Sequence, residues 1–415
     1  MPIDYTQVKP QVEKMGRMIG YKTQELSERA QTAFDQFQTL PDNDTIQARV
    51  QLARERDAGY RGAAPLSTVD EPVLGRYACP PAPDLATILA SDGSQVYPDI
   101  HGAAQYYLTN VAVFSFFHGE DRLPQEFSRP ELVYGETLIR DQYDQLVTNA
   151  TVNARRTVQE METLAAFAWE HRVAGQPIVA LFDGRLLFWL GQEVPDASAL
   201  ERDYRAAMVR LHDTHHWLAT EYDQPASLVG YLDRPTSRFV INLLQLLRME
   251  PDQIYRNELL RPGEYEGLDD RWLFRRWLDP GERSAIMVQQ SPQNKYYRQF
   301  GENYEIAFFY LNVGRSGAPH LARVEIPMWV AHSQRAVETV HALLVAQCHI
   351  SGAYPYALTR ADELAVVRNY DRQMLNMMVQ TELIRNQQTP AESGKLIGKY
   401  HTRAGRQHFE FGGNG

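Results

Sequence analysis

Residues 86–99 read ATILASDGSQVYPD, and residues 177–190 read PIVALFDGRLLFWL. Each segment is an apolar run typical of a buried strand, and each contains an aspartate followed by glycine: Asp92-Gly93 and Asp183-Gly184. A carboxylate in or beside a buried strand is costly unless it is paired or holds a metal ion. These two aspartates are therefore the first candidates for a functional site.

An Asp-Gly pair between apolar runs has an ordinary alternative interpretation as a hairpin turn. Glu160 weakens that alternative, because it lies on a predicted helix between the two aspartates in sequence. A strand–helix–strand unit can gather three acids at one end of a sheet. Such a cluster repels itself without a cation, and Mg²⁺ or Mn²⁺ removes the conflict. Two ions about 4 Å apart suit phosphodiester hydrolysis, although spacing alone does not separate this chemistry from glycoside cleavage.

The order of the predicted elements indicates an α/β fold, a mixed sheet with helical crossovers. We expect an N-terminal helical arm and linker over residues 1–83, one large domain over 84–390 with an insertion at about 250–304, and a basic tail over 391–415. Strands are predicted at 87–90, 103–117, 177–190, 227–232, 305–313 and 320–330, and helices at 136–172, 198–220, 237–249, 333–349 and 359–386.

The composition excludes several classes of protein. A net charge of -10 argues against a protein that coats nucleic acid by bulk electrostatics, although a local basic track can still hold one strand. Cys79 and Cys348 are far apart in sequence, so neither a disulfide framework nor a thiolate zinc site is predicted. With no secretory signal and no apolar stretch near the ~20 residues of a membrane span, a cytoplasmic protein without a membrane partner is expected.

Several blocks in this order resemble the NurA family. Residues 91–99 (SDGSQVYPD) and 106–111 (YYLTNV) resemble its first strand pair, and residues 181–184 (LFDG) resemble its second acidic strand. Residues 323–330 (RVEIPMWV) and 352–358 (GAYPYAL), which run into Ala361-Asp362, resemble its C-terminal blocks. The tripeptide DGS is weak evidence alone, whereas the ordered set is specific.

The resemblance implies a ribonuclease H-like mixed sheet with flanking helices and acids at the strand ends. It also implies a Mn²⁺- or Mg²⁺-dependent deoxyribonuclease with two ions, acting on single-stranded DNA and DNA ends. Its implied partners are a second copy of the chain and a HerA-like hexameric ATPase, in end resection for double-strand break repair. The alternative function is a non-catalytic adaptor of the same fold that binds DNA ends or the ATPase.

The family motifs map onto individual residues of this chain. Asp92 and Asp183 become the central metal ligands, and Glu160 becomes the helix ligand, with Glu162 less suitable because it points about 200° around the helix. The family often has a histidine after its Tyr-Pro block, where this chain has Asp362. Asp362 is kept as the fourth ligand, with Glu363 as the substitute.

Further residues have a functional and an ordinary interpretation. Tyr354 is a candidate for DNA contact or simple loop packing, and Lys395, Lys399 and Arg403 form a candidate DNA track or a solvated, disordered tail. Glu325 is expected to form a structural ion pair. The cluster His212, His215 and His216 has helical spacing, but a solvated helix face is favoured over a metal site.

Overall fold

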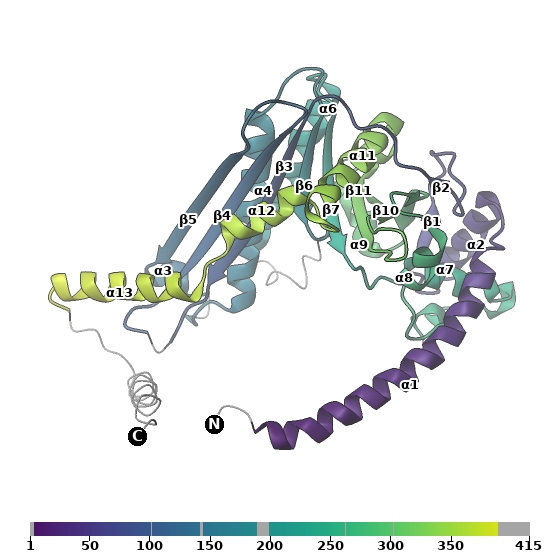
Figure 1. The fold of residues 1–415 in the computed structure, drawn as a ribbon, viewed down its shortest axis with the longest axis horizontal. Helices are drawn as coiled ribbons and strands as arrows, with labels where there is room; N and C mark the ends of the chain where they lie inside the picture. Colours follow the sequence, from purple (N-terminus) through teal and green to yellow (C-terminus); the bar gives the residue numbers. More distant parts are fainter. Residues whose placement is uncertain are drawn as a thin grey trace, which may run out of the picture.

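One mixed sheet runs through the molecule, and helices cover both of its faces (Figure 1). The computed structural model describes residues 4–100, 102–141, 144–188, 199–261, 263–301 and 303–388. The strands are β1 (Ala63–Pro65), β2 (Arg76–Tyr77), β3 (Ala86–Val96), β4 (Tyr106–His118), β5 (Gln125–Tyr134), β6 (Ile178–Asp183), β7 (Ala226–Asp233), β8 (Arg283–Ser284), β9 (Met287–Gln289), β10 (Ile306–Asn312) and β11 (Leu321–Pro327).

The helices alternate with these strands along much of the chain. They are α1 (Tyr5–Phe37), α2 (Asn43–Glu55), α3 (Glu136–Ile139), α4 (Asn149–Glu170), α6 (Ala199–Thr220), α7 (Phe239–Arg248), α8 (Arg271–Trp277), α9 (Pro292–Tyr296), α10 (Met328–Ala331), α11 (Gln334–Ser351), α12 (Tyr356–Ala365) and α13 (Asn369–Arg385). Short 3₁₀ turns occur at Pro251–Gln253, Glu258–Leu260 and Tyr297–Gln299.

The order of strands confirms the predicted mixed α/β class. Across the sheet the order is β1, β9, β10, β11, β7, β6, β3, β4, β5, and β2 and β8 join at one side. Strands β3, β4 and β5 are antiparallel neighbours, whereas β6 runs parallel to β3, and β7 runs parallel to β6. This five-strand core has the ribonuclease H-like arrangement that the family resemblance implies.

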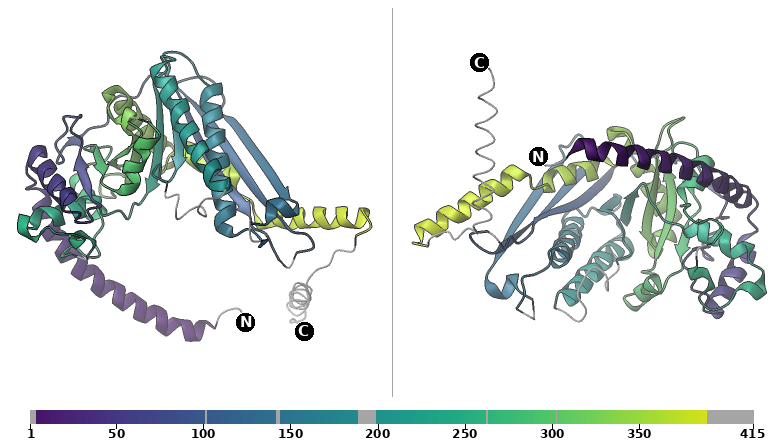
Figure 2. Two further views of the ribbon diagram at one scale, coloured as in Figure 1. Left: turned by 180° about the vertical axis from the view of Figure 1, so that it is seen from behind. Right: turned by 90° about the horizontal axis from the view of Figure 1, so that it is seen from below.

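The two faces of this core are covered by different helices. Leu89 and Ala180 pack in one apolar cluster with residues of α4 and α6, while Ile88 and Val179 pack in another with residues of α11 and α12. Successive residues of a strand point to opposite faces, so the near-continuous apolar runs of β3 and β6 fill both clusters. The view from behind shows α4 and α6 lying together across the sheet (Figure 2).

The N-terminal segment packs on the far end of the sheet, against the region predicted as an insertion. Helix α1 contacts α7 and α8, and α2 contacts α7. The buried ion pair between Glu71 and Arg283, with 2.6 Å between Oε1 and Nη2, fastens this segment to β8. The segment is not helical throughout, because β1 and β2 add to the sheet.

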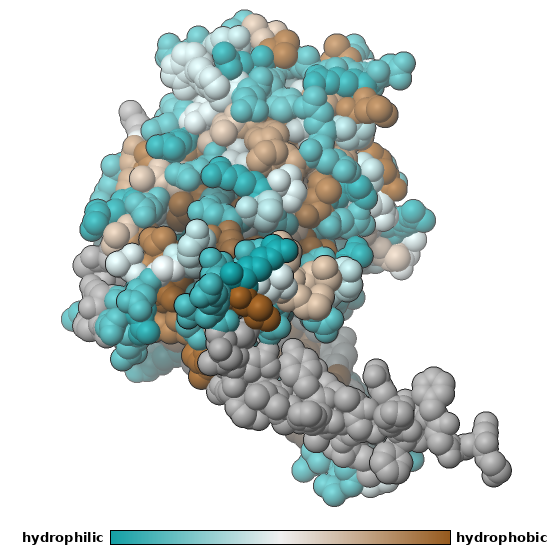
Figure 3. All heavy atoms as spheres, turned by 90° about the vertical axis from the view of Figure 1, so that its left-hand side faces the viewer, coloured by the Kyte–Doolittle hydropathy of each residue, from teal (hydrophilic) through white to brown (hydrophobic). Residues whose placement is uncertain are grey.

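Both ends of the described chain form projecting helices (Figures 1 and 2). The first half of α1 exposes five large apolar side chains, namely Tyr5, Val12, Met15, Met18 and Ile19. Helix α13 has no buried residue. On the side of the molecule that Figure 3 shows, apolar and hydrophilic residues are interspersed over the surface that is not grey, which is ordinary for a protein surface.

Three predicted elements differ from the structure. The helix predicted over 136–172 is divided into α3 and α4, because Thr148 caps a new start by accepting a hydrogen bond from the amide of Thr151. The helix predicted over 359–386 is divided into α12 and α13, and the carboxylate of Asp371 accepts from the amide of Arg368 at the second start. Strand β5 was not predicted. No helix in the described ranges combines the length and apolar character needed to cross a membrane.

Candidate active site

Asp92 and Asp183 lie side by side on neighbouring parallel strands. The register of β3 and β6 pairs Ser91 with Phe182, so the two aspartates take the next position on each strand. Adjacent strands are about 4.8 Å apart, and residues in register point to the same face. The hairpin interpretation of Asp92-Gly93 is wrong, because both residues pair with β4 inside one continuous strand.

The loop after Asp183 is held by a buried carboxylate from β11. Glu325 Oε2 accepts hydrogen bonds from the amides of Leu186 and Leu187, at 2.8 Å and 3.3 Å. Its other oxygen, Oε1, lies 2.6 Å from Nη2 of Arg323, so the predicted structural ion pair is confirmed. The pair also fixes the chain that leaves β6 next to Asp183, where Gly184 has a positive φ of 108°.

Glu160 reaches the site from α4, and the absence of a side chain at Gly93 makes room for it. Glu160 is only 5% exposed. A Cβ added to Gly93 would lie 2.3 Å from Glu160 Oε1 and 2.8 Å from Cγ of Arg156, closer than real Cβ atoms come to other atoms. The missing side chain at Gly93 therefore leaves the space that the side chains of Glu160 and Arg156 occupy in this structure.

Within the described part of the chain, Oε1 of Glu160 forms an ion pair with Arg156 and no hydrogen bond. Nε of Arg156 lies 3.0 Å from Glu160 Oε1, within ion-pair distance, yet neither atom has a partner with hydrogen-bond geometry. The contact is therefore electrostatic and poorly directed. A buried carboxylate oxygen without a hydrogen bond is costly, and such atoms are often completed by an ion or water.

Asp362 and Tyr354 approach from the other side of the sheet. Asp362 is exposed on α12, and its charge acts on both Asp92 and Asp183. The hydroxyl of Tyr354 is within hydrogen-bonding reach of the Asp183 carboxylate, and its ring packs edge-on against Tyr231. Glu363, the substitute for Asp362, instead forms an ion pair with Arg360.

The closeness of these acids changes their protonation. Burial raises the pKa of Asp92 to about 7, and the charges of Asp183 and Asp362 add to the effect. Burial also raises the pKa of Glu160 to about 7, opposed by Arg156. Partial burial also raises the pKa of Asp183, although this residue remains partly exposed to solvent. The metal-free cluster therefore favours partial protonation near neutral pH.

The carboxylate oxygens of these acids are the type of ligand that a hard divalent cation prefers. Their side chains, however, are not close enough together to coordinate one. All four acids offer carboxylate oxygens, and Glu160 Oε1 is without a hydrogen bond. Among the described residues, no three histidine, cysteine or acidic side chains are close enough together to hold a metal ion. Mutual repulsion among the acids and the contact of Glu160 with Arg156 both oppose a closer approach of these side chains.

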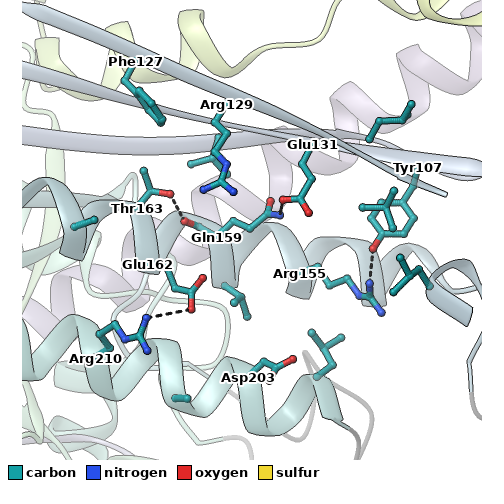
Figure 4. A pocket seen from close by; sticks show the side chains of 18 of the residues that line it. Tyr107, Phe127, Arg129, Glu131, Arg155, Gln159, Glu162, Thr163, Asp203 and Arg210 are labelled. Atoms are coloured by element: carbon teal, nitrogen blue, oxygen red, sulfur yellow. Dashed lines mark hydrogen bonds and ion pairs between the residues drawn. The ribbon is translucent and has the colours of Figure 1, made fainter. Parts of the chain in front are cut away.

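A groove lies on the other side of α4. It has a volume of about 1290 Å³ and runs between β5, α4 and the start of α6 (Figure 4). Glu162 points into it and lies 3.7 Å from Nη1 of Arg210, so Glu162 takes no part in the acid cluster. The groove contains none of the four predicted ligands.

The histidine cluster differs from its prediction. His212 and His215 are 1% and 0% exposed, so the interpretation as a solvated helix face is wrong for both. Burial lowers the pKa of His212 to about 3 and that of His215 to about 4. His212 stacks on Tyr304, and the two neutral histidine rings are buried on the inner side of α6.

The predicted DNA-contact residues Lys395, Lys399 and Arg403 lie outside the described residues.

Sequence reasoning did not identify Gly93 and Arg156 as parts of the site. The signal for Arg156 is its position one helical turn before Glu160, which places the two side chains on one face of α4. The signal for Gly93 is its place in the middle of a strand, where glycine often marks the close approach of another group.

Comparison with known proteins places this site in a family context. The NurA domain model matches residues 86–367. The NurA nuclease from Sulfolobus solfataricus is 13% identical, covering 83% of this chain and 94% of that chain, with a TM-score of 0.46. A NurA structure bound to dAMP and manganese is 11% identical, covering 73% and 90%, with a TM-score of 0.37. Human ENDOV is 12% identical, covering 79% and 97%, with a TM-score of 0.29. No curated protein matches the sequence.

The raised pKa values predict an unusual pH dependence of stability. The folded protein holds protons on Asp92 and Glu160 more tightly than the unfolded chain does, whose pKa values stay near 3.8 and 4.5. These groups therefore contribute stability at low pH that is lost as pH rises through about 7. In EDTA, we expect the stability of Asp92→Asn relative to the wild type to increase between pH 5 and pH 8, by on the order of 2 kcal/mol.

Thermal or urea unfolding at the two pH values measures this difference. Asp252→Asn is the control, because Asp252 is an exposed aspartate in the turn after α7. An Asp92→Asn effect of equal size at both pH values would contradict the assignment of a raised pKa to Asp92.

Proposed function

The chain belongs to the NurA domain family, and on this premise we propose that it is a divalent-metal-dependent deoxyribonuclease that hydrolyses phosphodiester bonds. The observation that carries the proposal is the approach of Asp92, Glu160, Asp183 and Asp362 from separate strands and helices to one place. A group of acids whose charges oppose one another has a use if it holds cations. Single-stranded DNA and DNA ends are the proposed substrates.

Each acid has a distinct part in the proposal. Asp92 and Asp183 hold the centre, because they are fixed by the sheet and by the loop that Glu325 anchors. Glu160 approaches over Gly93 from α4, and Asp362 approaches from α12. When bound, one or two Mn²⁺ or Mg²⁺ ions would stabilise the negative charge that develops on the phosphate.

The residues of the chain also bind and orient the substrate. The hydroxyl of Tyr354 stabilises the charged Asp183 carboxylate, and we propose that Tyr354 also contacts the bound strand. The basic tail with Lys395, Lys399 and Arg403 remains a proposed backbone contact. Because the chain carries a net charge of -10, such local cations are needed to bring DNA to the site.

The proposal extends to partners and setting. From the family resemblance we propose a homodimer that works with a HerA-like hexameric ATPase in resection of double-strand breaks. The exposed apolar side chains in the first half of α1 support a protein partner for that helix. Both cysteines are free, which is consistent with the cytoplasm as the proposed location.

Neutralising the central acids tests the proposed reaction. Asp92→Asn and Asp183→Asn should each reduce cleavage of a 5′- or 3′-labelled single-stranded oligonucleotide in Mn²⁺ by at least 100-fold, because a neutral amide is a poor ligand for a hard cation. Glu162→Gln is the matched control, since Glu162 lies on the same helix as Glu160 but faces the large groove. Wild-type cleavage by Asp183→Asn would contradict the assignment of Asp183 as a metal ligand, and absence of cleavage by the wild type would support the adaptor function in place of the nuclease.

Another prediction concerns the packing of Glu160. Gly93→Ala should keep the fold, because the clashing atoms belong to side chains that can move, yet it should displace Glu160 and reduce cleavage by at least 10-fold. Gly20→Ala is the control, because no atom lies within 4 Å of its added Cβ. Circular dichroism checks the fold. Full activity in Gly93→Ala would show that the position of Glu160 is not required.

A further prediction concerns the dimer. Met15 and Ile19 are 53% and 54% exposed on α1, and the double change Met15→Ser with Ile19→Ser should weaken self-association at least 10-fold in sedimentation experiments. Met378→Ser on α13, at 61% exposure, is the matched control. Dissociation by the α13 change and not by the α1 change would place the contact on α13.

A further inference from the structure

Arg156 links α4 to β3 beside the acid cluster. Its Nη1 donates hydrogen bonds to the carbonyl oxygen of Gly93 and to Oε1 of Gln95, both at 3.1 Å, while its Nε lies 3.0 Å from Glu160 Oε1. The side chain is 27% exposed, so it is neither a free surface cation nor a fully enclosed one. It therefore touches the strand that carries Asp92 and the carboxylate of Glu160 at once.

Arg156 is also the cation common to the surroundings of the acids. Its charge acts on Asp92, Glu160 and Asp183. A buried carboxylate that loses its positive partner is strongly destabilised, so a guanidinium beside Glu160 keeps the metal-free cluster tolerable. A divalent cation bound by the same acids would replace this function and repel the guanidinium.

Arg156 and two of the four acids line a common cavity that a displaced guanidinium could enter. This cavity has a volume of about 410 Å³, and its lining includes Arg156, Glu160, Asp183, Asn153 and Thr157. The cavity thus lies against the acids and has polar groups of α4 along one wall. A guanidinium is suited to a phosphate oxygen, because its planar fork of donors matches two acceptors.

We propose that Arg156 is a positioning residue that changes partner during the reaction: it holds Glu160 before ion binding, then a phosphate oxygen of the DNA strand in the 410 Å³ cavity. The inference rests on the proposed nuclease function. It makes ion binding a condition for full DNA binding, because the guanidinium is released only when a cation takes over the acids.

The neighbouring arginine provides a matched control. Arg155 is one position earlier on α4, and its Nη1 lies 2.5 Å from the hydroxyl of Tyr107, facing the large groove on the other side (Figure 4). Arg155→Gln removes the same charge and the same number of donors from the same helix. Any effect specific to Arg156 must therefore come from its contacts with β3 and Glu160.

The experiment compares full-length wild type, Arg156→Gln, Arg156→Lys and Arg155→Gln. Isothermal titration with MnCl₂ at pH 8.5 gives the ion affinity, and cleavage of a single-stranded oligonucleotide at saturating Mn²⁺ gives kcat and KM. We expect Arg156→Gln to bind Mn²⁺ at least threefold more tightly, because no guanidinium competes for Glu160. Its KM for the oligonucleotide should rise at least fivefold, with a smaller change in kcat.

The other variants complete the test. Arg156→Lys should keep Mn²⁺ affinity within twofold of wild type, because the charge remains, while KM rises about threefold because the planar fork is lost. Arg155→Gln should leave both quantities within twofold. If Arg156→Gln does not fold, the KM of Arg156→Lys decides the phosphate contact.

Specific results would overturn the inference. Weaker Mn²⁺ binding by Arg156→Gln would show that Arg156 only builds the site, and a wild-type KM in Arg156→Gln or Arg156→Lys would exclude the phosphate contact. Equal effects of Arg155→Gln and Arg156→Gln would show a general loss of charge. If wild type itself binds no Mn²⁺, the proposed metal-dependent function fails, which is a separate outcome.

Discussion

Repulsion between like charges is the constraint on which this site depends. Asp92 and Asp183 occupy equivalent positions on two adjacent parallel strands, and the side chain of Glu160 is buried nearby. In a medium of low polarity, such charges cannot all remain ionised without a compensating cation. The protein meets the constraint in the metal-free state with partial protonation and with the guanidinium of Arg156. Both neutralise less of the negative charge than a bound divalent ion would, so the metal-free cluster favours ion binding.

The fold supplies the closeness that produces this repulsion. The parallel pairing of β3 with β6 sets Asp92 beside Asp183, and the loss of a side chain at Gly93 lets α4 bring Glu160 against the same strand. Glu325 then fixes the loop that follows Asp183, and it is itself held by Arg323. Each contact belongs to ordinary secondary structure or packing. Together they hold acids where electrostatics alone would separate them, and the free energy for this comes from the apolar clusters on the two faces.

The sequence predicted the acids better than their surroundings. Apolar runs ending in Asp-Gly identified Asp92 and Asp183, because a charge in a buried strand is a strong local signal. The sequence could not show that β3 continues through Asp92-Gly93, because an Asp-Gly turn has the same local pattern. Strand β5 was missed because it is an exposed edge strand with charged residues and Pro130, and therefore lacks an alternating apolar pattern. The burial of His212 depends on Tyr304, which is distant in the sequence.

The net negative charge of the chain explains why, in the proposal, the metal ion binds before DNA. In the proposed nuclease, a net charge of -10 opposes DNA binding at long range, so affinity would have to come from a few cations near the acids. Before ion binding, Arg156, one of two arginines that line the cavity at the acids, is in contact with Glu160 and with the carbonyl oxygen of Gly93. One divalent ion at the acids would therefore both reduce the negative charge that meets the phosphate and release the guanidinium toward it. Under this proposal, the site binds DNA well only when the metal ion needed for cleavage is present, so the acids that would hold the metal also limit unproductive binding of DNA.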